Sequence, residues 1–402
     1  MSKLTDLLRH TLPDTLIPAS KKPLEPDPGI HNWVKGTYAN GLNGRIFISS
    51  DSDTIQFSAV EPVHPLILKW AAIQEDRIPN LLFLDTETTG LSGGTGTMAF
   101  MIGVGWIANN QFQTRQYFMT DPAHESDLLK QLHMDVSAFD TVVSFNGKSF
   151  DMNLLERRFI FHGLENPFRR WGHIDLLHLS RRLWKHILPG CALQQLEVSL
   201  QLTRRERMED IPGSLIPQVY FDYLRYGQTR ELQNVFYHNR IDVQSMVRLL
   251  DKISATLRYP HIDSESFMQW IDPVAIAGFF HDMGEVQRSV EIYEHELSSG
   301  ENIDCMMNLS SLFKSLGEFE KARRLWEVCA ERGKMTACVE LAKLAEHREK
   351  NLSDAIQWTE KAFSLIDKSH PNAVETFDNL IHRRNRILRK MGNKIEQQEF
   401  TG

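Results

Sequence analysis

The stretch LLFLDTETTGL, residues 81–91, decides how the rest of the chain is interpreted. Residues 81–84 form a short apolar run that predicts a buried strand, and the run then breaks into D-T-E at residues 85–87. Successive strand residues point to opposite faces, so we expect Asp85 and Glu87 side by side on one face.

Two carboxylates held together in this way repel each other. At about 4 Å and an effective dielectric constant of about 20, the repulsion is about 4 kcal/mol, so the pair requires a cation or a proton. A hard metal ion that prefers oxygen ligands suits such a pair. In an isolated D-x-E sequence, one carboxylate capping the turn and the other facing water would explain the pattern equally well.

Composition limits the classes of protein to consider. A chain of 402 residues, 42% of them hydrophobic and 24% charged, is typical of a soluble protein with two or three domains. The net charge of −7 means that any nucleic-acid surface must be local. Four cysteines without a C-x-x-C pair argue against a zinc ribbon or a disulfide framework. No apolar segment is long enough to predict a membrane span, and we expect a cytoplasmic protein.

The sequence predicts four regions. Residues 1–75 form an N-terminal extension in which residues 44–60 alternate apolar and polar side chains around a Ser-Asp-Ser-Asp turn, a pattern that suggests a β-hairpin. Residues 76–258 form an α/β domain, residues 259–271 a linker, and residues 272–395 an all-α domain of helical repeats.

The α/β domain is predicted to contain a mixed sheet flanked by helices. The strand ending at Asp85 is followed by two further strands, 98–107 and 111–118, in an antiparallel arrangement. The glycine-rich turn at residues 92–97, between the first strand and the strand at 98–107, lacks the features of a phosphate-binding loop. Further along are a helix at 126–135, a strand at 141–147 and helices at about 150–162 and 230–257. Asp151 lies in the first turn of the helix at about 150–162 and Asp175 precedes another helix, and a capping role is sufficient to explain either.

The C-terminal third repeats at a fixed period. Gly284, Gly317 and Lys350 are 33 residues apart, and each unit has the pattern helix, turn, helix. The spacing resembles tetratricopeptide repeats, although Thr359 departs from the aromatic position held by Tyr293 and Trp326. A terminal helix at about 373–391 would cover the end of the stack; a plain helical bundle is the alternative.

Two further acidic residues join the first pair: Asp151 follows the fourth predicted strand, and Asp242 lies in the long helix. Together with their surroundings they resemble the DEDD exonuclease superfamily, which has a ribonuclease H-like fold. The matching segments are LDTETTGL at 84–91, SFNGKSFDMNLLERR at 144–158 and HNRID at 238–242.

More closely, the whole chain resembles the YprB-type bacterial family, which includes the mitomycin repair exonuclease. The additional matching segments are HIDLLHLSRRLW, ERMEDIPGSLIP and the C-terminal repeats. The resemblance implies a metal-dependent exonuclease, 3′–5′ in polarity, that acts on DNA ends in repair. DNA is favoured over RNA as substrate, and a helicase or another repair factor is the protein partner expected at the repeats.

The resemblance also implies two-metal hydrolysis with Mg²⁺ or Mn²⁺. Asp85 would bridge both ions, and Glu87, Asp151 and Asp242 would complete the site. The general base should lie one helical turn before Asp242: four residues return to within about 40° of the same face, whereas five miss it by about 140°. This favours His238 as the base and places Tyr237 in the core, although a histidine in such a place can also be purely structural.

Substrate contacts are expected around the first two motifs. In the superfamily, the turn after the first motif offers backbone groups to the terminal nucleotide, and its leucine wedges against the base. The corresponding residues are Thr88, Thr89, Gly90 and Leu91, followed by Asn146 and Phe150 as second-line candidates. Residues 157–207 contain ten Lys or Arg against four Asp or Glu, as expected for a phosphate track or for an ordinary solvated helix face.

The sequence is also consistent with a second function. The same domain could bind nucleic acid without cutting it and recruit a protein through its repeats. All four carboxylates are present, which favours the nuclease. A proofreading module of a polymerase is a third reading, but the chain has no region large enough for a polymerase.

Overall fold

The computed structural model describes most of the chain. The described residues are 29–40, 45–53, 63–74, 79–90, 96–109, 111–203, 205, 210–258, 271–367, 369 and 371–399. The chain divides into two compact units, residues 1–272 and 273–402, each of which is described by itself. Within the described ranges, no helix has the length and apolar character needed to cross a bilayer.

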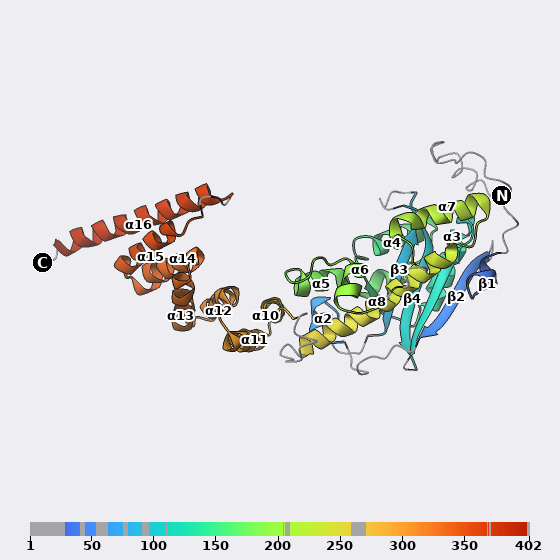
Figure 1. The fold of residues 1–402 in the computed structure, drawn as a ribbon, viewed down its shortest axis with the longest axis horizontal. Coiled ribbons are helices and arrows are strands. Elements are labelled where there is room, and N and C mark those ends of the chain that lie inside the picture. Colours follow the sequence, from blue (N-terminus) through green and yellow to red (C-terminus); the bar gives the residue numbers. More distant parts are fainter. Residues whose placement is uncertain are drawn as a thin grey trace. The chain divides into compact units, whose positions relative to one another are not determined.

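A seven-stranded mixed sheet forms the centre of the first unit (Figure 1), with the order β1-β2-β5-β4-β3-β6-β7. The strands are β1 (Thr37–Asn40), β2 (Arg45–Asp53), β3 (Leu81–Thr88), β4 (Ala99–Ala108), β5 (Gln111–Met119), β6 (Thr141–Ser144) and β7 (Gly172–Asp175). Strands β1 to β5 pair antiparallel among themselves, whereas β6 runs parallel to both β3 and β7. The predicted mixed sheet is thereby confirmed.

Helices surround this sheet. The α-helices are α2 (Pro65–Trp70), α3 (Glu125–Asp135), α4 (Asp151–Phe161), α5 (Leu176–Trp184), α6 (Leu193–Ser199), α7 (Ile216–Tyr226) and α8 (Leu232–Arg258). Short 3₁₀ turns are η2 (Ile30–Asn32), η3 (Pro122–His124), η4 (Pro167–Arg170) and η5 (Gly213–Leu215). The long helix α8 packs on β3, β4 and β5 and runs along the sheet in Figure 1.

Aromatic side chains fill the space between the sheet and α7 and α8. The rings of Phe100 and Tyr220 stack with centroids 4.1 Å apart, and Phe118 meets Tyr220 edge-on at 5.8 Å. Phe118 also lies 5.6 Å from Phe236 at the start of α8. Such pairs add to the burial of large apolar rings and hold α8 against the sheet.

The predicted turn in the N-terminal region is wrong. Residues 45–53 form one strand that continues through the Ser-Asp-Ser-Asp sequence. This strand pairs along its length with β5, and its first part also pairs with β1. Pairing with a strand distant in sequence overrides the local turn preference of Ser and Asp, and residues 37–53 belong to the sheet of the α/β domain.

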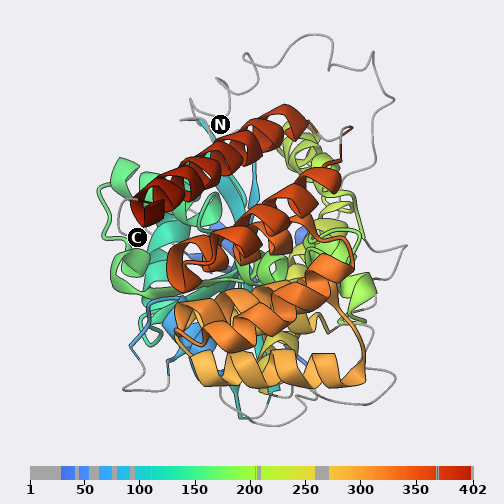
Figure 2. The ribbon, with the colours of Figure 1, turned by 90° about the vertical axis from the view of Figure 1, so that its left-hand side faces the viewer.

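The second unit contains paired helices, which Figure 2 shows side by side in orange and red. They are α10 (Pro273–Asp282), α11 (Val286–Ser299), α12 (Ile303–Ser315), α13 (Phe319–Glu331), α14 (Met335–Leu344), α15 (Leu352–Ser364) and α16 (Ala373–Glu399), with a π turn, η6 (Ala345–Glu349), after α14. Helices α10 and α11, α12 and α13, and α14 and α15 pack together in pairs. The all-helical C-terminal region with paired helices is confirmed.

The repeat period has a conformational basis. Gly284, Gly317 and Lys350 join the two helices of successive pairs, and all three have positive φ angles, of 81°, 80° and 57°. Glycine adopts this conformation without steric cost, whereas lysine does so less readily. The side chain of Thr359 is fully buried, at the position that Trp326 fills in the preceding pair. The third pair therefore keeps the geometry with smaller side chains.

Candidate functional site

Strand β3 supplies the first two carboxylates. The buried Thr86 and Thr88 alternate with the partly exposed Asp85 and Glu87, so the two carboxylates share one side of the strand. Register pairing sets Asp85 opposite Gly103 in β4. The two carboxylates are therefore carried by the interior of a sheet, which limits their movement.

The third carboxylate comes from the loop after β6. Asp151 begins α4, is 6% exposed, and accepts a hydrogen bond from the hydroxyl of Thr86. The loop before it is held by Asp175, whose carboxylate accepts from the backbone N–H groups of Asn146 at 2.9 Å and Lys148 at 3.1 Å. Asp175 also accepts from the N–H of Leu177 at 3.1 Å, which makes it the cap of α5 as expected.

Helix α8 supplies the fourth carboxylate and the histidine. Nε2 of His238 lies 3.5 Å from Oδ2 of Asp242, one turn further along, so the two residues share a face as their spacing predicts. Tyr237 is buried, and the guanidinium of Arg240 lies 5.7 Å from the centre of its ring.

The structure brings the four carboxylates together. Burial raises the pKa of Asp85 well above its usual range, and the charges of Asp242, Glu87 and Asp151 raise it further. Burial, followed by the charges of Asp242 and Asp151, likewise raises the pKa of Glu87. For Asp151, burial raises the pKa to about 6 despite the bond from Thr86. Four carboxylates gathered in one place favour binding of a cation or a proton.

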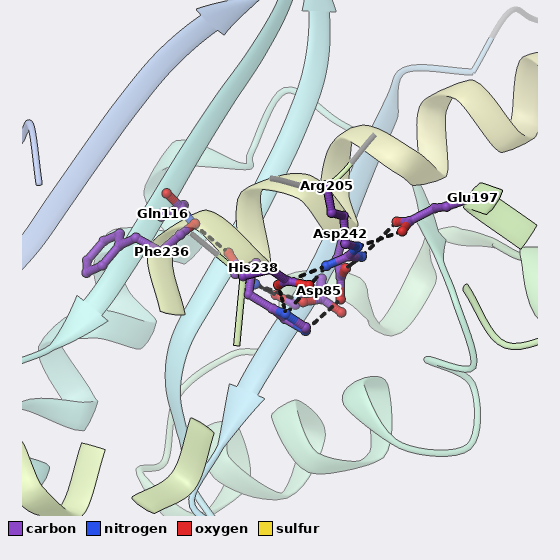
Figure 3. Close-up of polar contacts among 9 residues, drawn as sticks. Asp85, Gln116, Glu197, Arg205, Phe236, His238 and Asp242 are labelled. Atoms are coloured by element: carbon purple, nitrogen blue, oxygen red, sulfur yellow. Dashed lines mark hydrogen bonds and ion pairs between the residues drawn. The ribbon is translucent and has the colours of Figure 1, made fainter. Parts of the chain in front are cut away.

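Arg205, which the sequence analysis did not single out, reaches into this cluster (Figure 3). Its guanidinium holds Glu197 with two bonds of 2.6 and 2.7 Å, and Nη2 also bonds to Oδ1 of Asp242. Burial alone would lower the pKa of this arginine, but its bonds to Glu197 and Asp242 raise it above its usual range. In the described residues, Arg205 is thus a resident cation beside the fourth carboxylate.

A second unexpected residue contacts the histidine. Nδ1 of His238 lies 2.8 Å from Oδ1 of Asp210, and Nη1 of Arg205 lies 3.4 Å from the same carboxylate oxygen. Both Arg205 and Asp210 lie in or beside the segment ERMEDIPGSLIP, which matched the family without an assigned role. The side-chain types in that segment were the available signal, but their partners are distant in sequence.

The donors fit a divalent ion such as Mg²⁺ or Mn²⁺ in their chemistry, because all four are carboxylates and hard cations prefer oxygen. The positions of the four side chains, however, do not yet form a metal site. Among the described residues, no group of three or more His, Cys, Asp or Glu side chains is already set in metal-holding geometry. In this structure Asp242 accepts a bond from Arg205 and Asp151 accepts one from Thr86, so each of these two carboxylates already has a protein donor.

The expected substrate residues lie at one end of β3 and in the loop before α4. The hydroxyl of Thr88 donates to the carbonyl of Gly90 at 3.0 Å, and both backbone and hydroxyl of Thr89 bond to Met98. Leu91 lies outside the described residues. Asn146 is exposed with a positive φ of 65°, and Phe150 is half-buried.

The basic residues of segment 157–207 do not form one surface. Arg158 is buried and bonds to Glu125 through Nε at 2.6 Å, and Arg205 faces the carboxylate cluster. Arg157, Arg169, Arg170, Arg181 and Lys185 are exposed. Part of the positive charge predicted to line a nucleic-acid track thus serves internal ion pairs.

Comparison with known proteins gives three findings. Residues 82–254 match the model of the RNase H superfamily. The uncharacterized protein YprB of Bacillus subtilis (strain 168) is 31% identical over 296 residues, which are 71% of this chain and 69% of YprB. A family B DNA polymerase structure from the hyperthermophilic archaeon Pyrobaculum calidifontis is similar with a TM-score of 0.34 and 14% identity, covering 54% of this chain. The match spans only 29% of the polymerase.

The relation to YprB extends beyond the superfamily domain, because 296 matched residues exceed the 173 positions between residues 82 and 254. Strands β3 to β7 and most of helix α8 lie almost entirely within the residues that match the family model. The chain belongs to the YprB family and carries a ribonuclease H superfamily domain followed by paired helices.

Proposed function

We propose that this protein is a metal-dependent exonuclease that hydrolyses phosphodiester bonds at nucleic-acid ends, acting 3′–5′ on DNA in repair. The observation that carries the proposal is the group of four carboxylates from β3, α4 and α8, of which Asp85, Glu87 and Asp151 have raised pKa values. Clustered acids with raised pKa values are typical of a functional site that binds a cation.

Asp85, Glu87, Asp151 and Asp242 would hold two Mg²⁺ or Mn²⁺ ions, which would activate water and stabilise the charge on the leaving oxygen. The chain's own part in the reaction is proton transfer and orientation. Nδ1 of His238 lies 2.8 Å from Oδ1 of Asp210 and 3.4 Å from Nη1 of Arg205, and the shorter contact, to an acceptor, assigns the proton of the neutral imidazole to Nδ1. Nε2 then keeps its lone pair beside Asp242. Nε2 is therefore the atom that accepts the proton of the attacking water.

Arg205 gives up its bond to Asp242 if a metal ion takes the same oxygen, Oδ1. The guanidinium keeps Glu197 and Asp210 as partners, so it does not become an unpaired buried charge. Loss of the bond between Arg205 and Asp242 would then make the free energy of metal binding less favourable.

The test is cleavage of a DNA oligonucleotide labelled at one end at a time, with Mg²⁺, Mn²⁺ or EDTA. Asp85→Asn should abolish a metal-dependent product ladder that the wild type forms, because it removes a charge while keeping the shape of the side chain. Glu156→Gln is the matched control, since Glu156 is exposed on α4 five residues after Asp151. Retained cleavage by Asp85→Asn would refute the assignment, and binding without cleavage under every condition would favour a non-catalytic scaffold.

We also propose that the paired helices of the second unit bind a protein partner, such as a helicase or another repair factor. Stacked helix pairs commonly form such surfaces. Apolar side chains of α16 remain accessible, including Val374 at 75% and Phe377 at 48% exposure. Charged substitutions at these two positions should weaken binding of a candidate partner without changing cleavage of free DNA.

A further inference from the structure

A row of three positions crosses the sheet beside the carboxylate cluster. Asp85 of β3 is in register with Gly103 of β4, and Gly103 is in register with Gln116 of β5. Residues paired in this way project to the same face. A carboxylate and an amide therefore flank a position that has no side chain.

Asn239 of α8 occupies the space over Gly103. A Cβ atom placed on Gly103 would lie 2.0 Å from Oδ1 of Asn239, far closer than atoms can approach. One helical turn later α8 again comes close to β4, since a Cβ on Gly105 would lie 2.6 Å from Cγ1 of Val243, as well as 2.3 Å from Cζ of Phe112 on β5. Glycine in a strand often marks such a close approach, and here two of them let α8 lie close against β4.

The amides form a chain of hydrogen bonds with one direction. Nε2 of Gln116 donates to the carbonyl oxygen of Phe236 at 2.8 Å and to Oδ1 of Asn239 at 2.9 Å. Nδ2 of Asn239 then donates to Oδ2 of Asp85 at 2.8 Å. A carbonyl can only accept, so the group that Gln116 turns toward Phe236 must be its NH₂, and this choice fixes the orientation of Asn239 as well.

The chain is closed to water. Asn239 is 0% exposed and Gln116 is 4% exposed, so neither amide can exchange these partners for solvent. A buried amide with all its partners in place resists rotation, because any other orientation leaves a polar group unpaired. Asp85 therefore receives its bond from a donor that is itself held in place.

We infer that Asn239, held by Gln116 and seated on Gly103, is a positioning residue that fixes the carboxylate of Asp85 for cation binding. This inference rests on the proposed function, in which Asp85 is one of the four carboxylates that would hold the metal ions. By bonding Oδ2 from the α8 side, Asn239 sets the rotation of the carboxylate and hence the direction in which Oδ1 points. Partners of this kind around metal ligands typically change metal affinity about 10–100-fold when they are removed.

The first experiment measures binding of Mn²⁺ alone to the full chain after treatment with EDTA, by calorimetry. Asn239→Ala should raise the Kd for Mn²⁺ about 10–100-fold. Gln116→Leu should raise it less, by about tenfold, because Asn239 remains but loses the partner that orients it. Arg240→Ala is the matched control, since this neighbouring side chain of α8 is 34% exposed and pairs with Asp51; its Kd should stay that of the wild type.

The second experiment tests the contact between Gly103 of β4 and Asn239 with a double-mutant cycle. Gly103→Ala should lower the urea midpoint of unfolding and weaken Mn²⁺ binding, because its methyl group meets Asn239. In the Asn239→Ala background that side-chain oxygen is gone, and adding Gly103→Ala should change the midpoint little further. Equal losses in both backgrounds would show that the contact is not the reason for the glycine.

The outcomes separate the inference from the proposed function. Wild-type protein that binds Mn²⁺ and cleaves DNA, with unchanged Kd in both Asn239→Ala and Gln116→Leu, would overturn the inference and leave the nuclease standing. Wild-type protein that neither binds Mn²⁺ nor cleaves DNA would overturn both. If Asn239→Ala does not fold, Gln116→Leu decides the question, because it leaves Asn239 and its bond to Asp85 in the protein.

Discussion

Nδ1 of His238 lies 2.8 Å from Oδ1 of Asp210, while Nε2 of the same ring lies 3.5 Å from Oδ2 of Asp242. The first carboxylate fixes which nitrogen of the neutral ring carries the proton, and the second marks the side on which the free lone pair lies. A buried histidine oriented by an acid on one nitrogen is suited to accept a proton on the other.

Asp210→Asn should therefore lower kcat by about 10–100-fold. This is a smaller loss than the about 10²–10⁴-fold expected for His238→Ala, which removes the base itself. The asparagine keeps the shape of the contact but cannot stabilise the positive ring that forms when Nε2 takes a proton. Asp222→Asn, whose carboxylate accepts from Gln218 on α7, is the control.

The diagnostic measurement is the double variant. If Asp210 acts through His238, adding Asp210→Asn to His238→Ala should reduce kcat no further, because the two residues form one unit. If the losses of kcat from the two single substitutions multiply in the double variant, Asp210 serves another purpose, such as holding Arg205.

Proton and metal should compete at Asp151, whose pKa burial raises to about 6 from 3.8. A raised folded-state pKa means that the folded protein holds the proton more tightly than the unfolded chain. In EDTA, ionisation of Asp151 should therefore reduce the free energy of unfolding as pH rises from about 4 to about 6.

Asp151→Asn removes this cost, so its stability relative to the wild type should grow by about 1–2 kcal/mol across that interval and level off above about pH 6. Urea unfolding at each pH checks this. With Mn²⁺ present, the wild type should be more stable than Asp151→Asn, because only the wild type offers the metal a charged ligand at this position. If Asp151→Asn remains the more stable protein in Mn²⁺, that result would argue against a metal at this position.

Much of the fold follows from local sequence. The apolar run before Asp85 has enough hydrophobic residues for a buried strand, and the period of Gly284, Gly317 and Lys350 marks the turns between paired helices. The strand at 45–53 could not be predicted in the same way, because its polar end pairs with β5, about sixty residues later. Local preference for a turn is a weaker influence than pairing with a formed sheet.

The candidate site likewise contains residues that local sequence predicts and residues that depend on tertiary contacts. The spacing of His238 and Asp242 on one helix predicts their shared face, and the structure has it. Arg205, Asp210 and Asn239 were not predicted, because their roles depend on partners brought from β3, β5 and α8 by the tertiary fold. A glycine within a strand, such as Gly103, was the local signal for a close approach, but it does not identify the side chain that approaches.

Arg205 should be essential for stability through Glu197, whose side chain is 2% exposed. Arg205→Met leaves that carboxylate buried without its partner and should cost about 3–5 kcal/mol in the free energy of unfolding. Glu197→Gln in the same background should restore a large part of the loss. A double-mutant cycle by urea unfolding measures the coupling, and a value near zero would show that Glu197 finds another partner.

In the helical unit, Glu346 is the centre of an ion-pair network between η6 and α16. Its side chain is 0% exposed and receives two bonds from Arg386, at 2.8 and 2.7 Å, and one from Lys390 at 2.8 Å. Burial by itself would raise the pKa of this carboxylate, but the bonds from Arg386 and Lys390 lower it to about 2. Its stabilisation should therefore be fully present above about pH 4.5 and lost as pH falls toward 2.

Glu346→Gln should destabilise α14–α16 by about 1–3 kcal/mol at pH 7, a range reduced because Arg386 and Lys390 are each 46% exposed. Hydrogen exchange followed by mass spectrometry suits the measurement, because it reports residues 335–399 separately from the sheet. The difference between variant and wild type should narrow as pH falls below 4.5. Glu360→Gln is the control: Glu360 pairs with Arg384, but its side chain is 49% exposed, so its loss should change exchange little. Equal effects of the two substitutions would show that burial of Glu346 does not set its contribution.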